Sequence, residues 1–433
     1  MKAVTTSLLA LGAAVLTASA TEPWTLERAL GFARTNSPDA RIALHRVAAG
    51  QAGIEQATSA LWPRLSFQSG YTRTDNPMLG FGHILNQRAY SASIDFNDVP
   101  DTDNLNVRGV IGVPLYAGGR ITAERNAARA TGNATRQEAE AVRQTVAGEV
   151  ARAFFTVQKT RQFIMAAQAA VNSYETNLAM VFQRVDAGTA LRADVLDLEV
   201  RLAQSREDLI RARNANALAE RALQNLLGIE GQEFAVAESA PRLKVPPADA
   251  SANRPEFAAI TERIRAADAE VRGAKSGYLP RVSGFGSLDY DRGWVTDGSS
   301  DSYTGGVLIE WDLWDGWLTR SKVSEAGANA AAAREQERKV RLAVNFEIEQ
   351  ARLDLHQAQE RLQVGEKTVA QAGESLALTR DRFAQGLALA TQLIDAQTAL
   401  TAARVRQADA EADVQIATAA LRKALGLPIL ESD

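Results

Sequence analysis

The amino-acid sequence predicts a mainly α-helical chain with a small β part, in which long antiparallel coiled-coil hairpins accompany four strands. Three observations carry this prediction. Similar motifs occur twice along the chain, which indicates two internal repeats. Each copy has a long glycine-poor segment of Ala, Leu, Arg, Glu and Gln, residues that favour helix. Each copy also has two segments in which apolar and polar residues alternate, as in half-buried strands.

Composition restricts the class of function. The 433 residues include 48 Lys and Arg and 52 Asp and Glu, a formal net charge of −4, which gives no basic surface for nucleic acid. The absence of Cys excludes thiolate metal sites and cysteine nucleophiles. The three histidines, His45, His83 and His356, lie in unrelated sequence contexts. We therefore expect neither an enzyme nor a cofactor or metal site.

The first element, residues 1–20, is predicted to be a signal peptide. Lys2 precedes an apolar run from Leu8 to Leu16, and Ala18-Ser19-Ala20 then provides the small residues of a cleavage site. A short buried or membrane helix is the alternative, but the run is too short to span about 30 Å of hydrocarbon. Cleavage would leave a mature chain that begins at Thr21.

The duplication organises the remaining chain. The motif NSPD at residues 36–39 recurs as NRPE at 253–256, an offset of 217, and RVDAG at 184–188 recurs as RFAQG at 382–386, an offset of 198. The difference predicts a 19-residue insertion in the first copy.

Three segments follow the signal peptide in this division. We expect a first repeat over residues 21–230, containing one helix, two strands and a long helical hairpin. A proline-containing linker follows over 231–252, and a second repeat occupies 253–433.

The first helix and the strands follow from local patterns. A helix is expected from Ser37 to Trp62, because proline suits its first turn and the proline after Trp62 disfavours helix. Residues 65–72 then alternate as a strand. Two further strands place apolar side chains on one face: Val107, Ile111, Val113 and Leu115 in the first copy, and Tyr303, Val307, Ile309, Trp311 and Leu313 in the second. Loops are expected over 73–106 and 291–302.

Each strand pair leads into a helical hairpin. Residues 120–187 would form one helix of about 100 Å at 1.5 Å per residue. Gly188 is expected to end that helix in a left-handed conformation, and a second helix returns to Gly228. Along the return helix, apolar and small residues recur at alternating steps of three and four, which is typical of a coiled coil.

Four strands per chain decide the expected architecture. An open sheet cannot lie in lipid, because each unpaired edge group would cost several kcal/mol. Three chains would supply twelve strands, a number within the range of closed outer-membrane barrels. A small soluble sheet packed on helices is the alternative.

Aromatic residues gather where helix meets strand. They are Trp62, Tyr116, Tyr278, Trp311, Trp314 and Trp317. Because all such junctions lie on one side of the expected barrel, they predict one interfacial belt in contact with outer-membrane lipid. Ordinary packing at a junction is the alternative for each of them.

These segments together resemble the TolC-type outer-membrane efflux protein family. The resemblance rests on WTLERALGFARTNSPDARIA, VPLYAGGR, WDLWDGWLTR and the two hairpin segments RVDAGTALRADVLDLEVRL and RFAQGLALATQLIDAQTAL, and it spans residues 24–427. It implies a homotrimer in the outer membrane of a Gram-negative type of cell, with a 12-stranded β-barrel and a 12-helix periplasmic tunnel. The implied function is export through a tripartite efflux or type I secretion system, with a periplasmic adaptor protein and an inner-membrane transporter as partners.

The resemblance also implies two sites at the periplasmic end. The periplasmic aperture would be formed by Asp194, Asp197, Gln392 and Asp395, whose three copies would surround the pore. The alternative is solvated residues at helix N-termini, where the helix dipole favours aspartate. The hairpin tips offered to the adaptor would be Gly188, Thr189, Gly386 and Leu387. Phe383 and Ala388 stand where some family members use polar groups to latch the mouth.

A periplasmic coiled-coil adaptor or structural protein is the alternative function. It would explain the heptad pattern of the hairpins. It would not explain four alternating strands with aromatic residues at their helical junctions.

Overall fold

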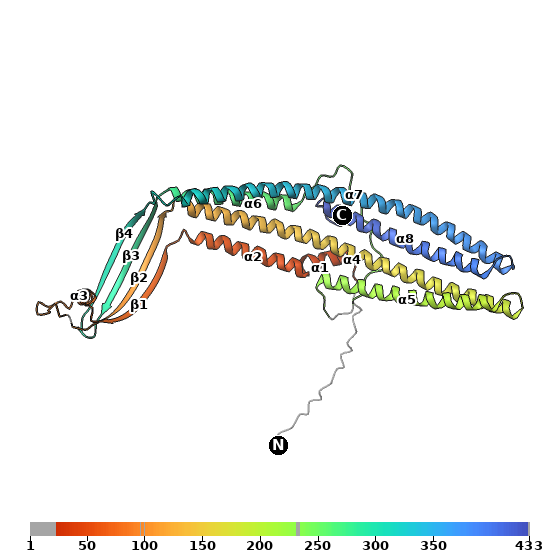
Figure 1. The fold of residues 1–433 in the computed structure, drawn as a ribbon, viewed down its shortest axis with the longest axis horizontal. Coiled ribbons are helices and arrows are strands. Elements are labelled where there is room, and N and C mark those ends of the chain that lie inside the picture. Colours follow the sequence, from red (N-terminus) through yellow and green to blue (C-terminus); the bar gives the residue numbers. More distant parts are fainter. Residues whose placement is uncertain (1–22, 96, 99, 231–233, 432–433) are drawn as a thin grey trace, which may run out of the picture.

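The structure is a computed structural model that describes residues 23–95, 97–98, 100–230 and 234–431. The described chain is elongated, with one sheet at one end and long helices over the remaining length (Figure 1). The prediction of a mainly α-helical chain with a small β part is confirmed. The predicted signal peptide lies outside the described residues.

The four strands form one antiparallel sheet in the order β1-β2-β3-β4. Their bounds are Arg64–Thr74 for β1, Thr102–Tyr116 for β2, Arg281–Arg292 for β3 and Ser299–Glu310 for β4. The central pair joins the two halves of the chain, with Val107 opposite Tyr290. Two predicted strand residues, Trp311 and Leu313, lie beyond β4. The strand ends at Glu310 because its partner Arg281 is the first residue of β3, so no backbone remains to pair further.

Two helices precede the sheet where we expected one. They are α1, Leu26–Asn36, and α2, Pro38–Ser59. The Thr25 hydroxyl accepts a hydrogen bond from the Arg28 amide, and the Ser37 hydroxyl accepts one from Ala40, so each helix has its own cap. Ser37 therefore begins α2 as predicted, and Thr25 was the sequence signal for α1.

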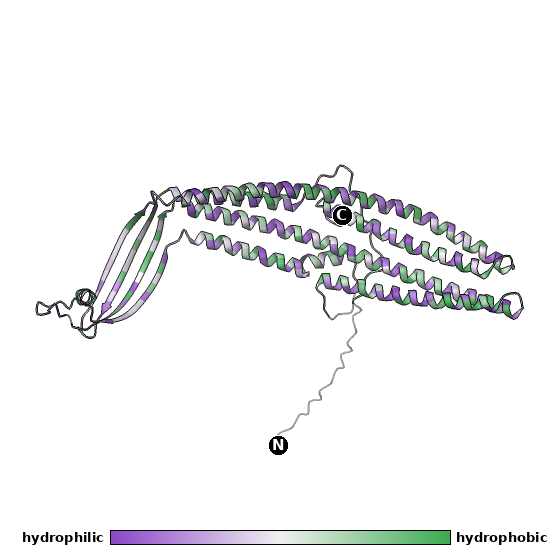
Figure 2. Cartoon of the chain, in the orientation of Figure 1, coloured by the Kyte–Doolittle hydropathy of each residue, from purple (hydrophilic) through white to green (hydrophobic). Residues whose placement is uncertain are grey.

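The long helices extend away from the sheet. They are α4, Arg120–Asp186, α5, Arg192–Leu227, α6, Pro255–Lys275, α7, Leu318–Ala384, and α8, Ala390–Ala424. The first and the fourth of these contain 67 residues each, so each is about 100 Å long. Figure 2 shows hydrophilic and hydrophobic residues mixed along all of them.

None of the helices in the described part of the chain combines the length and the hydropathy needed to cross a membrane.

The helices lie side by side in a fixed order. Near the sheet, α4 packs between α2 and α6, and α6 packs on α7. Farther from the sheet, α4 packs between α5 and α8, and α8 packs on α7. One long margin of the molecule is therefore formed by β1, α2 and α5, and the other by β4 and α7 (Figure 1).

The largest apolar core lies midway along the helices. There α1 packs on α4, and Phe154, Leu223 and Leu227 are buried together. The predicted linker, 231–252, crosses the same region near its start, where the Trp24 amide donates to the Ala235 carbonyl at 2.7 Å. The Trp24 ring stacks on Phe234 with 5.7 Å between centroids.

Candidate functional site

One face of the sheet is apolar and exposed. The register places Leu65 opposite Ile111, and Leu288 opposite Tyr303, so apolar side chains from all four strands share that face. Its large exposed members are Leu65, Phe67, Tyr71, Ile111, Leu115, Leu288, Tyr290, Tyr303, Val307 and Ile309. A continuous exposed apolar surface of this kind marks contact with a membrane or a protein.

The opposite face of the sheet carries a polar network. Asn104 donates to Asp291 at 2.5 Å, Asn106 donates to the same carboxylate at 3.1 Å, and Arg108 forms an ion pair with Asp289. Each pair joins β2 of the first half to β3 of the second. The alternation within one strand predicted a polar face, but the partners depend on the β2–β3 register, which no local pattern reveals.

The predicted aromatic belt residues all lie at the end of the sheet that meets the long helices. All six are exposed: Trp62, Tyr116, Tyr278, Trp311, Trp314 and Trp317. The structure brings four of them into pairs. The Trp311 indole donates to the Tyr278 carbonyl at 3.2 Å, and the rings of Trp314 and Trp317 meet edge to face at 5.1 Å.

The predicted hairpin tips are tight turns at the far end of the molecule. Gly188 and Gly386 have φ of +73° and +81°, a conformation that glycine adopts without steric cost. The Thr189 amide donates to the Arg184 carbonyl, and the Leu387 amide donates to the Arg382 carbonyl, both at 2.8 Å. These bonds satisfy the free carbonyls at the ends of α4 and α7.

Arg184 connects the two hairpin tips, and this connection was not predicted from the sequence. Its guanidinium donates to the carbonyl of Phe383 and lies 4.8 Å from the centroid of the Phe383 ring. The first contact places positive charge at the C-terminal end of α7, where the helix dipole favours it. Arg184 belongs to the repeated turn motif, but nothing in that motif shows that its partner lies in the other hairpin.

The four predicted aperture residues divide into two kinds. Asp194 accepts a hydrogen bond from the Leu191 amide at 3.0 Å, and Gln392 accepts one from the Leu389 amide at 3.1 Å. These two side chains therefore cap α5 and α8. Asp197 and Asp395, three residues farther along, are exposed. The two helix starts share one apolar cluster that contains Leu198 and Leu393.

An ion network connects three helices between the tips and the core. Asp409 of α8 lies 2.8 Å from both Lys159 of α4 and Arg361 of α7, and Asp413 lies 2.8 Å from Arg361. Burial alone would raise the pKa of Asp409, but hydrogen bonds from Lys159 and Arg361 lower that pKa below its ordinary value. The predicted coiled-coil seam runs along other positions of α8, so it did not reveal this network.

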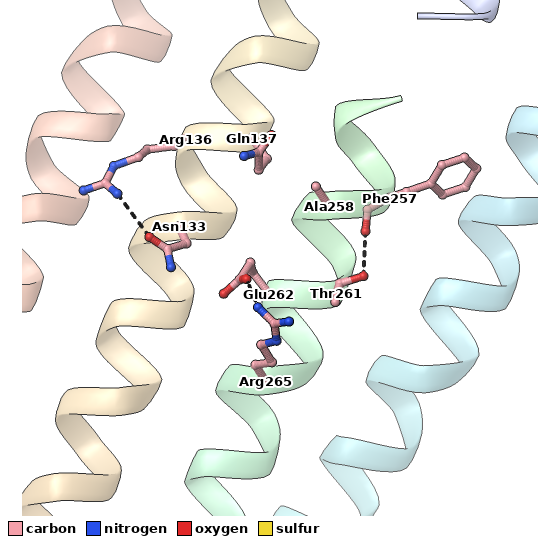
Figure 3. Close-up of a pocket in the computed structure, with 8 residues that line it drawn as sticks. All are labelled: Asn133, Arg136, Gln137, Phe257, Ala258, Thr261, Glu262 and Arg265. Atoms are coloured by element: carbon pink, nitrogen blue, oxygen red, sulfur yellow. Dashed lines mark hydrogen bonds and ion pairs between the residues drawn. The ribbon is translucent and has the colours of Figure 1, made fainter. Parts of the chain in front are cut away.

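An open groove lies between α4 and α6, and Figure 3 shows its lining. Arg136 donates to Asn133 at 3.1 Å and to Gln51 of α2 at 3.0 Å. Arg265 forms an ion pair with Glu262 on its own helix. Both arginines of the groove are thus paired with neighbouring side chains, and the lining side chains form no nucleophile–base pair among the described residues.

Comparisons with known proteins give one family. A sequence profile described as "Outer membrane efflux protein" matches residues 29–229 and 247–427. The outer membrane protein OprJ of Pseudomonas aeruginosa is 25% identical over 71% of this chain and 67% of its own length. The pyoverdine export outer membrane protein OpmQ of Pseudomonas putida is 24% identical over 93% of this chain and 85% of its own length.

Solved structures share the fold. The outer-membrane channel OprN has a TM-score of 0.79 at 21% identity, over 93% of this chain and 89% of its own. The outer membrane protein VceC of Vibrio cholerae has a TM-score of 0.78 at 19% identity, over 94% of this chain and 97% of its own.

Proposed function

Because the chain belongs to the outer membrane efflux protein family, we propose that three copies of it assemble into a closed channel that exports substrates across the outer membrane. The chain is an outer-membrane protein whose long helices lie in the periplasm, as the relatives and the structural neighbours indicate. The trimer, its partners and its route of export are the parts that we propose.

The single observation that carries the trimer is that, in the described part of the chain, no further helix or strand covers the outer side of either long margin. At one end the edge strands β1 and β4 leave a row of backbone groups unpaired within the described sheet. Along the helices, α7 forms one margin and α2 with α5 forms the other. A head-to-tail contact between unlike margins closes into a ring when the rotation permits it.

Exposed apolar side chains follow both helical margins. On α7 they recur at spacings that place them on one face of the helix: Leu342, Phe346, Leu353, Val364 and Leu378. On α5 the corresponding residues are Leu196, Val200, Ile210 and Leu218. The α7 stripe of one copy would therefore pack on α2 and α5 of the next copy.

Closure of the sheets would form a 12-stranded β-barrel. In this arrangement β4 of one copy pairs with β1 of the next, so no edge remains exposed to lipid. The apolar face of the sheet then contacts lipid and the polar network faces the lumen. The aromatic residues at the helical end form an interfacial belt at the periplasmic side.

The hairpins of three copies would form the 12-helix periplasmic tunnel. Asp197 and Asp395, exposed near the tips, would place carboxylates around its mouth, with Asp194 and Gln392 capping the helices beneath them. The turns at Gly188-Thr189 and Gly386-Leu387 would meet a periplasmic adaptor, which connects the channel to an inner-membrane transporter.

Efflux is the favoured route of export. The names of the relatives support it, because they include a toluene efflux pump protein and a solvent efflux pump protein of Pseudomonas putida. Type I secretion is the second route that such a channel could serve.

The assembly can be tested by changing one margin. Phe346→Glu puts a charge in the α7 stripe, which we expect to prevent trimer formation because the charge would be buried between copies. Gln359→Glu adds the same charge at an exposed position of α7 outside the stripe, so it should leave the trimer intact. Native mass spectrometry of detergent-extracted protein gives the stoichiometry, and planar-bilayer recording gives the conductance. A wild-type chain that remains a monomer and forms no pore would refute the proposal.

A further inference from the structure

The exposed face of helix α3 is a surface that the proposed channel does not explain. This helix, Pro77–Asn86, lies in the loop between β1 and β2, at the end of the sheet away from the long helices (Figure 1). We propose that the α3 helices of three copies meet at the channel axis and constrict the external mouth. This inference rests on the proposed function, because it requires the trimer.

The position of α3 is fixed by Gln87, the residue that follows the helix. Gln87 is 1% exposed, and its side-chain amide donates to the Asp103 carbonyl at 2.7 Å and to Asn104 Oδ1 at 2.9 Å. Its own oxygen accepts a hydrogen bond from Thr296, in the loop between β3 and β4. One buried side chain thus ties the loop that carries α3 both to β2 and to the other external loop.

The two external loops also fit closely together. A Cβ atom placed on Gly298 would lie 2.7 Å from the Gln87 carbonyl oxygen, a distance that real Cβ contacts do not reach. Only a residue without a side chain fits there unless the backbone moves. The loop that carries α3 is therefore seated on the β3–β4 loop rather than projecting freely.

The contacts of α3 place it on the polar side of the sheet. Asn104, which bonds to Gln87, also donates to Asp291 in the polar network. The register puts Thr102 on the same face as Asn104, and His83 Nδ1 of α3 lies 3.5 Å from the Thr102 hydroxyl. The helix packs against β4 as well as β2, so it crosses the end of that face. In the proposed barrel this side is the lumen.

The exposed side of α3 is unsuited to a water-filled lumen. The helix contains no Asp, Glu, Lys or Arg. Ile84 and Gly80 are buried toward the sheet, while Met78, Leu79 and Leu85 are exposed, with Met78 79% exposed. Apolar surface of this kind is stabilised when it is removed from water.

A second copy of α3 is the occupant that fits this surface. Lipid would contact the opposite, apolar face of the sheet, so it does not reach α3 in the proposed barrel. A charged partner would find no opposite charge on the helix. Three-fold symmetry brings identical uncharged faces together at the axis, where each covers the others. The loop between β1 and β2 contributes one such helix per chain, hence three per channel, whereas the short loop between β3 and β4 contains none.

Cysteine crosslinking tests this contact directly, because the chain contains no Cys. In Met78→Cys, oxidation of the trimer should pair two of the three thiols and give a covalent dimer with one free chain on a non-reducing gel. Single-channel conductance in a planar bilayer should fall on oxidation and return on reduction. Leu65→Cys is the matched control, because Leu65 is equally exposed at 79% but lies on the apolar face at the other end of β1. It should remain a single chain.

Leu85→Cys, on the same exposed side of α3, is the second variant if Met78→Cys does not fold, and the same result is expected. Conducting trimers in which neither thiol crosslinks, even with a short bifunctional maleimide, would overturn the contact and leave the proposed function standing. A wild-type chain that forms no trimer would overturn both.

Discussion

Trp317, a residue of the proposed belt, has a strained backbone conformation. Its φ of +70° lies in the left-handed region, where a bulky side chain costs roughly 1–3 kcal/mol. Gly119, which precedes α4 as Trp317 precedes α7, has φ of +83° and avoids that cost. The Trp317 ring contacts Trp314 and lies 5.3 Å from the Arg320 guanidinium. An aromatic residue in this strained position is consistent with the proposed interfacial belt.

A pH dependence of stability is expected at Asp409. The folded-state pKa of this carboxyl is lowered. Its ion pairs therefore contribute their full share to the free energy of unfolding above the unfolded-state pKa of about 3.9, and this contribution is lost as the pH falls through the folded-state pKa. Asp409→Asn should lower the free energy of unfolding by about 1–2 kcal/mol at pH 7, and the difference from wild type should shrink below pH 4.

The change in stability can be measured by thermal melting at pH 7 and at a pH below 4, with circular dichroism as the signal. Asp354→Asn, an exposed aspartate on α7, is the control and should shift the melting midpoint little at either pH. An equal shift in both variants would show that the network of Lys159, Arg361 and Asp409 does not stabilise the helices.

At the scale of elements, the hairpins depend on how their helices end and begin. Gly188 and Gly386 end α4 and α7 in the left-handed conformation, and the side chains of Asp194 and Gln392 cap the helices that follow. Arg184 then connects one turn to the other through Phe383. The tips are thus built from local backbone chemistry, and a single side chain couples them.

Replacement of Gly188 tests the turn. No atom lies within 4 Å of a Cβ at this position, so the cost of Gly188→Ala comes from the backbone conformation alone and should be about 1 kcal/mol. Gly327→Ala is the opposite control, because Gly327 lies exposed within α7 and alanine there should stabilise by about 0.5–1 kcal/mol. Thermal melting of the two variants should therefore shift in opposite directions. A stabilising effect at Gly188 would contradict the left-handed turn.

At the scale of the whole molecule, the main feature is that both long margins of the described chain expose an unpaired edge strand and apolar helix surface. The edge strand β1 lies on the same side of the elongated chain as the apolar stripe of α5, and the edge strand β4 lies on the same side as the stripe of α7. A monomer would expose both over the full length of the molecule. Assembly of like copies covers all of them with one repeated contact, which is why a closed ring explains the structure better than a soluble helical adaptor.

The proposed periplasmic aperture has its own test at this scale. Asp395→Ala should raise single-channel conductance in a planar bilayer and weaken block by divalent cations, because it removes three carboxylates from the mouth. Asp194→Ala is the comparison, since Asp194 caps α5 and its loss should lower thermal stability rather than change ion block. Unchanged conductance in Asp395→Ala would count against a carboxylate ring.

The sequence by itself determined the elements whose causes are local. Glycine at 188 and proline at 38 set helix ends, and alternation around Leu65 and Phe67 identified a strand and its apolar face. These signals act within a few residues, because backbone conformation and side-chain periodicity are local properties. The helix after Thr25 also has such a local signal, since the Thr25 hydroxyl caps it.

The tertiary structure alone decided which distant segments meet. The pairing of Arg108 with Asp289, the contact of Arg184 with Phe383 and the hydrogen bond from Thr296 to Gln87 each join residues far apart in the sequence. The position of α5 and α7 at the margins follows from the order of helix packing in the same way. Many registers and packing orders satisfy the same periodicity, and the folded chain selects among them by the complementarity of whole surfaces.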